Sequence, residues 1–155
     1  MSDTKTSFEK EIAIVLTDLL KALKIEAQVA VVQTDEGHYK ADIQTQETGL
    51  LIGHHGEVIN SLQLITGVIL FKQLKTWVHV VLDVGGYRQM REENIKEMVN
   101  RIVAEVETTS QPVILPFLTP LERRIVHMML TENTKVMSES SGEGRERRVT
   151  IKPRV

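Results

Sequence analysis

Two glycines placed between two helical patterns constrain the fold of this 155-residue chain more than any other feature. Gly53 and Gly56 enclose His54 and His55, and apolar residues at helical spacing lie before and after them. The pattern predicts a tight turn between two helices. Such a turn has no side chain to block a close approach, and the amide N–H groups that open the second helix favour an anion such as phosphate. The pattern alone is compatible with a plain structural corner or with a phosphate clamp.

The segments around the turn predict an α+β domain over residues 1–86. Apolar residues at a spacing of three and four predict helices, and apolar–polar alternation bounded by glycine predicts strands. In chain order, the predicted elements are a helix (8–23), a hairpin of two strands (27–33 and 39–44) with a turn at 34–37, a short helix (47–52), a helix from residue 58 and a strand (77–84).

The remaining chain predicts a connecting helix over 87–109 and a second, smaller α+β domain over 110–155. Thr119, Pro120 and Glu122 form a strong helix start, with a capping threonine, proline at the first helical position and glutamate at the third. The predicted elements of this domain are an edge strand containing Pro116 (113–118), a helix (119–132) and two strands (135–140 and 148–152). The side chains predicted to be buried on its helix are Leu121, Ile125, Met128 and Met129.

Charge and cysteine content limit the possible functions. The chain has no cysteine, which excludes disulfides, thiolate metal sites and a cysteine nucleophile. It has no signal-peptide pattern and no long apolar run, so we expect a soluble, intracellular protein. The net charge is −2, but residues 1–118 hold 11 Lys and Arg against 16 Asp and Glu, whereas residues 119–155 hold 8 against 5. A phosphate-binding surface is therefore expected near the C-terminal end.

The adjacent histidines do not predict a metal site. Neighbouring residues at a turn rarely aim at one ion, and no further ligand stands at a suitable spacing. No nucleophile, base and orienting residue form a recognisable catalytic arrangement either. We therefore expect no metal, no cofactor and no enzymatic activity; His54 and His55 either contact phosphate or act as spacers.

The element order and the glycine turn together resemble a KH domain of the prokaryotic type, an αββααβ fold, across residues 8–84. Leu51-Ile52-Gly53-His54-His55-Gly56 corresponds to the Ile-Gly-x-x-Gly loop of that family, although many members carry a basic residue where this chain has histidines. The resemblance implies that the loop grips the backbone of about four nucleotides. The residues implied in this grip are Ile52, Gly53, His54, His55 and Gly56. The candidates for an apolar wall along the bases, or alternatively for ordinary core, are Ile43, Ile52, Val58 and Ile59.

Arg123 and His127 form a second pattern, four residues apart on a predicted helix, so that their side chains stand on one face and can hold one phosphate. For an isolated pair of this kind, an ordinary exposed helix face is the better interpretation. With the strands and the glycine-rich loop that follow, however, the pair resembles an R-3-H domain, a single-stranded nucleic-acid-binding module, across residues 110–153. The resemblance implies further phosphate contacts by Arg145, Arg147 and Arg148.

A KH domain followed by an R-3-H domain resembles the bacterial Jag family, the SpoIIIJ-associated proteins, here in a short form without the N-terminal Jag domain. The resemblance implies a cytoplasmic binder of single-stranded RNA or single-stranded DNA that acts as a post-transcriptional regulator or RNA chaperone linked to cell-envelope growth. It also implies a small separate KH protein or a second copy of the chain as partner, and no membrane association. The alternative is a protein-interaction scaffold in which the clamp is degenerate. The excess of acidic over basic residues in 1–118 is the observation that favours this alternative.

Overall fold

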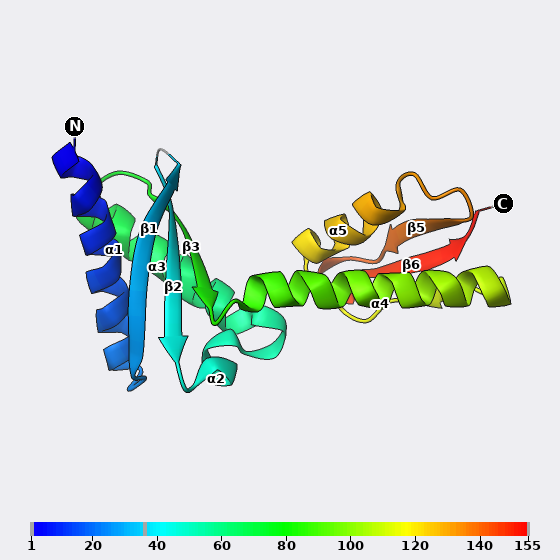
Figure 1. The fold of residues 1–155 in the computed structure, drawn as a ribbon, viewed down its shortest axis with the longest axis horizontal. Helices are drawn as coiled ribbons and strands as arrows, with labels where there is room; N and C mark the ends of the chain where they lie inside the picture. Colours follow the sequence, from blue (N-terminus) through cyan, green and yellow to red (C-terminus); the bar gives the residue numbers. More distant parts are fainter. Residues whose placement is uncertain (1, 36, 155) are drawn as a thin grey trace. The chain divides into compact units, whose positions relative to one another are not determined.

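The computed structural model describes residues 2–35 and 37–154, and the chain forms two compact units, Met1–Arg88 and Gln89–Val155. The first unit holds a three-stranded sheet in the order β1-β2-β3, in which β1 pairs antiparallel and β3 parallel with β2 (Figure 1). Its elements are α1 (Ser2–Ala22), β1 (Ala27–Asp35), β2 (His38–Thr45), α2 (Thr48–Ile52), the 3-10 turn η1 (His54–Gly56), α3 (Glu57–Leu74) and β3 (His79–Val84). The predicted α+β class and αββααβ order are confirmed.

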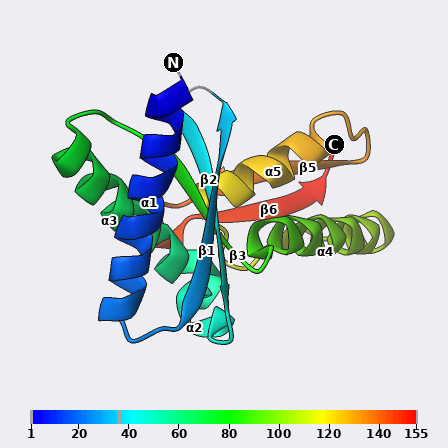
Figure 2. The same ribbon diagram turned by 60° about the vertical axis from the view of Figure 1, so that its left-hand side comes forward.

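One face of this sheet is covered by α1 and α3, which also contact each other (Figures 1 and 2). The alternation predicted for β2 is confirmed, because Tyr39, Ala41 and Ile43 are buried while Lys40 and Asp42 are only half-buried. These buried side chains form one core with the apolar faces of both helices. The predicted hairpin is also confirmed, although its turn includes residue 36, which lies outside the described residues.

Two element boundaries of the first unit differ from the prediction. The first helix begins at Ser2 rather than at residue 8, because no proline or glycine interrupts helical geometry between these positions. The last strand begins at His79 rather than at Trp77, because α3 ends in a left-handed residue, Lys75 (φ 55°), and the chain needs Thr76 to Val78 to reach the sheet edge.

The second unit is built on the antiparallel sheet β4-β6-β5. The strand with Pro116 nearby lies at the edge, as predicted, but it pairs over two residues only. The elements are α4 (Tyr87–Thr109, whose first two residues belong to the first unit), β4 (Val113–Ile114), α5 (Pro120–Leu130), β5 (Val136–Ser141), the 3-10 turn η2 (Gly144–Glu146) and β6 (Arg148–Pro153).

The predicted start of α5 is confirmed in atomic detail. The Thr119 side chain accepts a hydrogen bond from the Glu122 amide, and the Glu122 carboxylate accepts one from the Thr119 amide at 2.8 Å. The predicted buried face of α5 is partly wrong, because Leu121 and Met128 are exposed by 65% and 66%. The Glu122 carboxylate faces inward, where it accepts the capping hydrogen bond. The buried side of the helix therefore carries Glu122, Val126 and Leu130 rather than Leu121 and Met128.

The helix predicted as a connector contributes to the second core. Ile95, Val99 and Val106 of α4 are buried together with side chains of α5, β5 and β6. An ion pair between Arg91 Nε and Glu122 Oε1, 2.8 Å apart, also joins α4 to α5. The predicted domain limits, 1–86, 87–109 and 110–155, stay a prediction. Among the described residues, no helix combines the length and apolar character that a membrane span requires.

Candidate nucleic-acid interface

Both glycines of the loop adopt backbone conformations that other residues avoid. Gly53 has φ 70° and ψ −170°, and Gly56 has φ 82° and ψ 14°. A Cβ atom added to Gly53 would lie 2.3 Å from Cγ2 of Val58, and one added to Gly56 would lie 3.1 Å from Cε1 of Tyr87. The bend between α2 and α3 therefore depends on glycine at both positions, as the sequence predicts.

The two histidines form the surface of this bend. Their ring centroids lie 3.9 Å apart with the planes at 65°. His54 is exposed and His55 is half-buried, and His55 adopts a left-handed conformation (φ 53°). Within the described residues no group of three or more histidine, aspartate or glutamate side chains could hold a metal ion. The exposed position of His54 suits a contact with a bound anion.

The helix that follows the loop starts without a side-chain cap. Its N-cap residue is Gly56, which has no side chain to accept from the first amide groups of α3. An uncapped helix start attracts anions through these amides and the helix dipole. Glu57 in the first turn is acidic, and the loop itself carries no lysine or arginine. Any hold on phosphate at this loop therefore comes mainly from the backbone.

The four candidates for an apolar wall divide into core and surface. Ile43 and Ile59 are 0% and 1% exposed, so they belong to the core and cannot contact a ligand. Ile52 is half-buried against the same core, and Val58 is 41% exposed. Of these four candidates, only Ile52 and Val58 can therefore contribute an apolar surface beside the loop.

In the second unit, Arg123, His127 and Arg147 lie around one open cavity of about 310 Å³. Each makes a contact that limits its movement. Arg123 Nη1 donates to the Leu118 carbonyl oxygen at 2.8 Å, and Arg147 Nε donates to Ser140 Oγ at 2.9 Å. The residues that line the cavity are Pro120, Arg123, Arg124, His127, Met128, Thr131, Ser140 and Arg147. Arg123 and His127 of the helix and Arg147 of the loop thus line the same cavity, as the sequence suggests.

The His127 ring is held on one side only. Its Nδ1 lies 2.7 Å from Ser138 Oγ on β5. Where the Ser138 hydroxyl donates to Nδ1, the ring proton is on Nε2, and this nitrogen can donate to a phosphate oxygen. Because Ser138 fixes the plane of the ring, His127 can contribute orientation as well as a hydrogen bond.

The other two predicted arginines are not brought into this cavity. Arg148 pairs with Ser141 on the neighbouring strand, whereas Ser140 pairs with Val149, so Arg148 lies on the opposite face of the sheet from Ser140. Its guanidinium donates to the carbonyl oxygens of residues 145 and 147 and lies 5.6 Å from the ring centre of Phe117. Arg145 lies in η2 and does not line the cavity.

The lining of the cavity includes a residue that the sequence analysis did not select. Arg124 is exposed and lines the cavity beside Arg123. Its position directly after Arg123 was the only available signal, and a helical wheel places it about 100° around the helix from Arg123. The lining contains three arginines and no carboxylate. On the opposite face of the sheet, by contrast, Lys152 pairs with Glu139 and lowers the pKa of that carboxyl.

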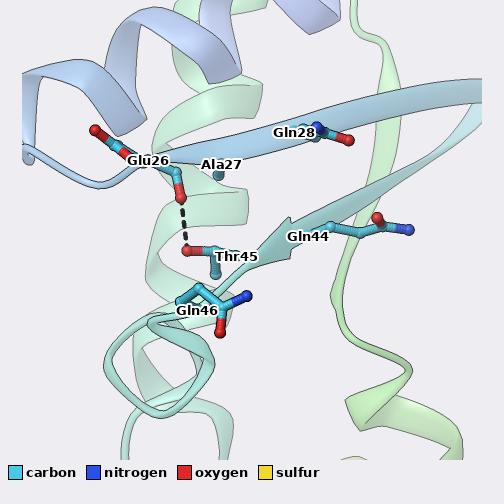
Figure 3. Close-up of a pocket in the computed structure, with 6 residues that line it drawn as sticks. All are labelled: Glu26, Ala27, Gln28, Gln44, Thr45 and Gln46. Atoms are coloured by element: carbon cyan, nitrogen blue, oxygen red, sulfur yellow. Dashed lines mark hydrogen bonds between the residues drawn. The ribbon is translucent and has the colours of Figure 1, made fainter.

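A second surface depression, in the first unit, lacks groups that could hold phosphate. It has a volume of about 470 Å³ and lies where β1 begins and β2 ends (Figure 3). Gln28 and Gln44 face each other across the two strands, and Thr45 Oγ1 donates to the Glu26 carbonyl oxygen at 2.7 Å. Its lining is neutral except for Glu26, so it does not resemble the arginine cavity.

Comparison with protein-family models matches both units. Residues 10–82 match the KH domain of KhpA/KhpB, and residues 93–153 match the R-3-H domain. The fold and the two matches together define a protein in which a KH domain precedes an R-3-H domain. The chain belongs to the KhpB family, also called Jag, and the family resemblance seen in the sequence is confirmed.

Several curated relatives carry the name RNA-binding protein KhpB. The chain is 28% identical over 137 residues to the protein of Clostridium symbiosum. The aligned region covers 88% of this chain and 62% of the relative. It is 33% identical over 135 residues to that of Lactiplantibacillus plantarum, covering 86% and 42%, and 26% identical over 138 residues to that of Bacillus subtilis, covering 88% and 66%. The chain thus spans less than two thirds of the length of each of these relatives.

Proposed function

We propose that this chain binds single-stranded RNA and catalyses no reaction. The observation that carries the proposal is the cavity in the second unit, where Arg123, Arg124 and Arg147 meet without a lining carboxylate although the whole chain has a net charge of −2. Arginine guanidinium groups match the geometry of phosphate oxygens. The relatives named RNA-binding protein KhpB support RNA as the ligand.

The two surfaces contribute different interactions. The Gly53–Gly56 loop offers close backbone approach, an uncapped helix start and the exposed His54. The arginine cavity offers charge. Each surface alone binds a strand weakly, and two on one chain bind more tightly because the second contact forms at a high effective concentration. We assign phosphate contacts to Arg123, Arg124, His127 and Arg147, and place Arg145 and Arg148 at the margin of this surface.

Fluorescence anisotropy with labelled single-stranded oligomers of RNA and of DNA tests the proposal. The expected result is that Gly53→Asp, which places a carboxylate and a bulky side chain in the loop, and Arg124→Gln/Arg147→Gln each weaken binding. Because Gly53→Asp also strains the loop backbone, circular dichroism checks that this variant is still folded under the conditions of the binding assay. Gly49→Ala is the matched control for the glycine, because nothing lies within 4 Å of an added Cβ there. If the native chain binds neither oligomer, the proposal is wrong. Tighter binding of RNA than of matched DNA indicates that the 2′-hydroxyl is read.

A second candidate function, a protein-interaction scaffold, is favoured by the apolar outer side of α3. Leu64, Ile65 and Val68 are exposed by 65%, 49% and 47%. A salt titration separates the two functions. Phosphate binding weakens steeply as salt rises, whereas apolar docking does not.

The cellular part of the proposal rests on the family resemblance. It comprises a cytoplasmic role as post-transcriptional regulator or RNA chaperone linked to cell-envelope growth, with a small KH protein or a second copy as partner. Cross-linking of the tagged chain to RNA in cells, followed by sequencing, tests the first part, and the expected result is enrichment of transcripts for envelope proteins. Light scattering of the purified chain, alone and with a small KH protein, tests the second.

A further inference from the structure

A cavity of about 200 Å³ lies between α3 and β3, apart from the glycine loop and the arginine cavity. One helix and one edge strand supply its walls, together with the turn between them. Its lining combines apolar side chains, two ring systems and two amides: Asn60, Gln63, Leu64, Gly67, Trp77, Val78, His79 and Val80.

Four rings of the first unit, Phe71, Trp77, His79 and His38, lie at or beside this cavity. Trp77 is the only tryptophan of the chain and is 52% exposed. Its indole lies 5.7 Å from the ring of Phe71 and 6.5 Å from that of His79, between ring centres. His79 in turn stacks on His38, with centroids 4.9 Å apart and planes at 12°. Aromatic residues make up only 4% of the chain, yet an exposed indole is supported here on two sides by other rings.

Gly67 leaves the indole open toward the helix. An added Cβ at this position would lie 4.0 Å from Cη2 of Trp77, which is ordinary van der Waals contact. The backbone at Gly67 has no positive φ, so the helix does not need glycine there. A glycine inside a helix costs about 1 kcal/mol relative to alanine. Its effect at this position is to keep space beside the ring.

Arg88 holds the two amides of the cavity. Its Nη2 donates to Asn60 Oδ1 at 3.2 Å and to Gln63 Oε1 at 3.0 Å, and its Nε donates to the Leu82 carbonyl oxygen at 2.6 Å. Because both amide oxygens accept from Arg88, the NH₂ groups are the donors that Asn60 and Gln63 can offer to a ligand. Among residues 2–35 and 37–154, no carboxylate forms an ion pair with Arg88. Its guanidinium is therefore not neutralised by an ion pair, although the Asp83 carboxylate accepts a hydrogen bond from the Arg88 backbone amide at 3.2 Å.

The surrounding sequence is free of negative charge. Residues 58–82 contain no aspartate or glutamate and include Lys72 and Lys75, although residues 1–118 as a whole are acidic. This stretch forms nearly all of α3, the turn and most of β3. A nucleic-acid strand that leaves the glycine loop along α3 thus meets no carboxylate of α3 itself after Glu57.

We propose that this cavity is a nucleotide subsite, in which one base of the bound strand stacks on the Trp77 indole while Arg88 and the two amides it holds contact the edge or phosphate of that nucleotide. The subsite rests on the proposed RNA-binding function and extends it beyond the loop. An RNA ligand accounts for the guanidinium, the amides and the open ring together, whereas an apolar protein partner accounts for the rings alone.

The emission of Trp77 gives a direct test, because no other tryptophan contributes to it. An eight-nucleotide single-stranded RNA is titrated into the full chain, with emission and anisotropy recorded together. The matched ligand is a strand of eight abasic nucleotides. We expect the RNA to quench the emission and the abasic strand to leave it unchanged. Equal quenching by both ligands overturns the stacking of a base.

Variants then test the energetic role of the ring. Trp77→Ala is expected to weaken RNA binding by about 5- to 140-fold, the equivalent of about 1–3 kcal/mol for one base stacked on an aromatic ring. Trp77→Phe should restore most of this loss. Gly67→Leu, which fills the cavity and removes no ring, should weaken binding as well. Leu23→Ala is the control, since Leu23 is equally exposed (55%) but lies at the end of α1.

The outcomes separate the subsite from the proposed function. If the RNA binds by anisotropy, but Trp77 emission is unchanged and Trp77→Ala binds as tightly as the native chain, the subsite is wrong and the proposed function stands. If the RNA does not bind at all, the proposed function fails. If Trp77→Ala lowers the molar mass of the RNA-free protein in light scattering and leaves its RNA affinity unchanged, the face binds protein, and the subsite is again wrong.

Discussion

The salt dependence of RNA binding should report how many arginines of the second unit contact phosphate. Arg124 and Arg147 are the informative pair, because both are exposed and their loss leaves the fold intact. Arg124 makes no hydrogen bond or ion pair within the described residues, and Arg147 holds only Ser140. Arg123 is less suitable, since its guanidinium also fixes the Leu118 carbonyl group before the helix.

Each phosphate contact on a single strand changes the slope of log K against log salt by about 0.7. Arg124→Gln/Arg147→Gln should therefore make the slope less steep by about 1.4. Over a tenfold rise in salt concentration, the ratio of the dissociation constant of the double variant to that of the native chain should therefore fall by about 25-fold. The assay is anisotropy of a labelled RNA oligomer at five or more salt concentrations and constant pH.

The control for this measurement is Arg101→Gln. Arg101 is an exposed arginine of the same unit that does not line the cavity. Its loss removes one positive charge, as does each of the two substitutions in the double variant, so the change per arginine corrects for the long-range field of the protein. An unchanged slope in the double variant, or an equal change per arginine in the control, would refute the assignment of phosphate contacts to the cavity.

Three further outcomes follow from the first unit. Gly53→Ala should lower the free energy of unfolding by about 1–3 kcal/mol in urea denaturation, owing to backbone strain, whereas Gly49→Ala should not destabilise the chain. Burial, and to a smaller extent the charge of Glu9, raises the pKa of Tyr39 above 10.0 in the folded chain. As pH rises, the Tyr39 hydroxyl therefore loses its proton at a lower pH in the unfolded chain than in the folded chain. The contribution of Tyr39 to stability should be full below about pH 10 and fall as pH rises further. Tyr39→Phe should reduce the loss of stability in pH-dependent melting, and Lys40, whose pKa is raised by hydrogen bonding to Asp42, should account for part of the remaining loss. RNA binding should weaken in His54→Ala, because the exposed imidazole can form a hydrogen bond with phosphate; an unchanged affinity would make His54 a spacer.

Local patterns were sufficient to predict most of the fold. Alternation in β2, the glycine requirement at Gly53 and the Thr119–Glu122 cap each act within a few residues, so the sequence shows them directly. The buried side of α5 was not predictable in this way. It depends on the Glu122 carboxylate turning inward toward Arg91, 31 residues away in the chain.

The candidate site shows the same limit. The pair Arg123 and His127 could be placed on one face because helical spacing fixes it, and the cavity includes both. Arg148 could not be excluded from the sequence alone, because its face depends on the register between β5 and β6. Trp77 and Arg88 were not selected either. They meet around Gln63 and its neighbours only after α3, β3 and the start of α4 have packed.

The most direct test of the central claim is an amide chemical-shift map of the isotope-labelled chain during titration with a single-stranded RNA oligomer. The account predicts that the largest changes fall on two groups of amides. One comprises Gly53 to Ile59 in the first unit, and the other surrounds Arg123, His127, Ser140 and Arg147 in the second. If neither group responds at saturating RNA, for example because the changes fall only on the outer side of α1, the proposed mode of RNA binding is wrong.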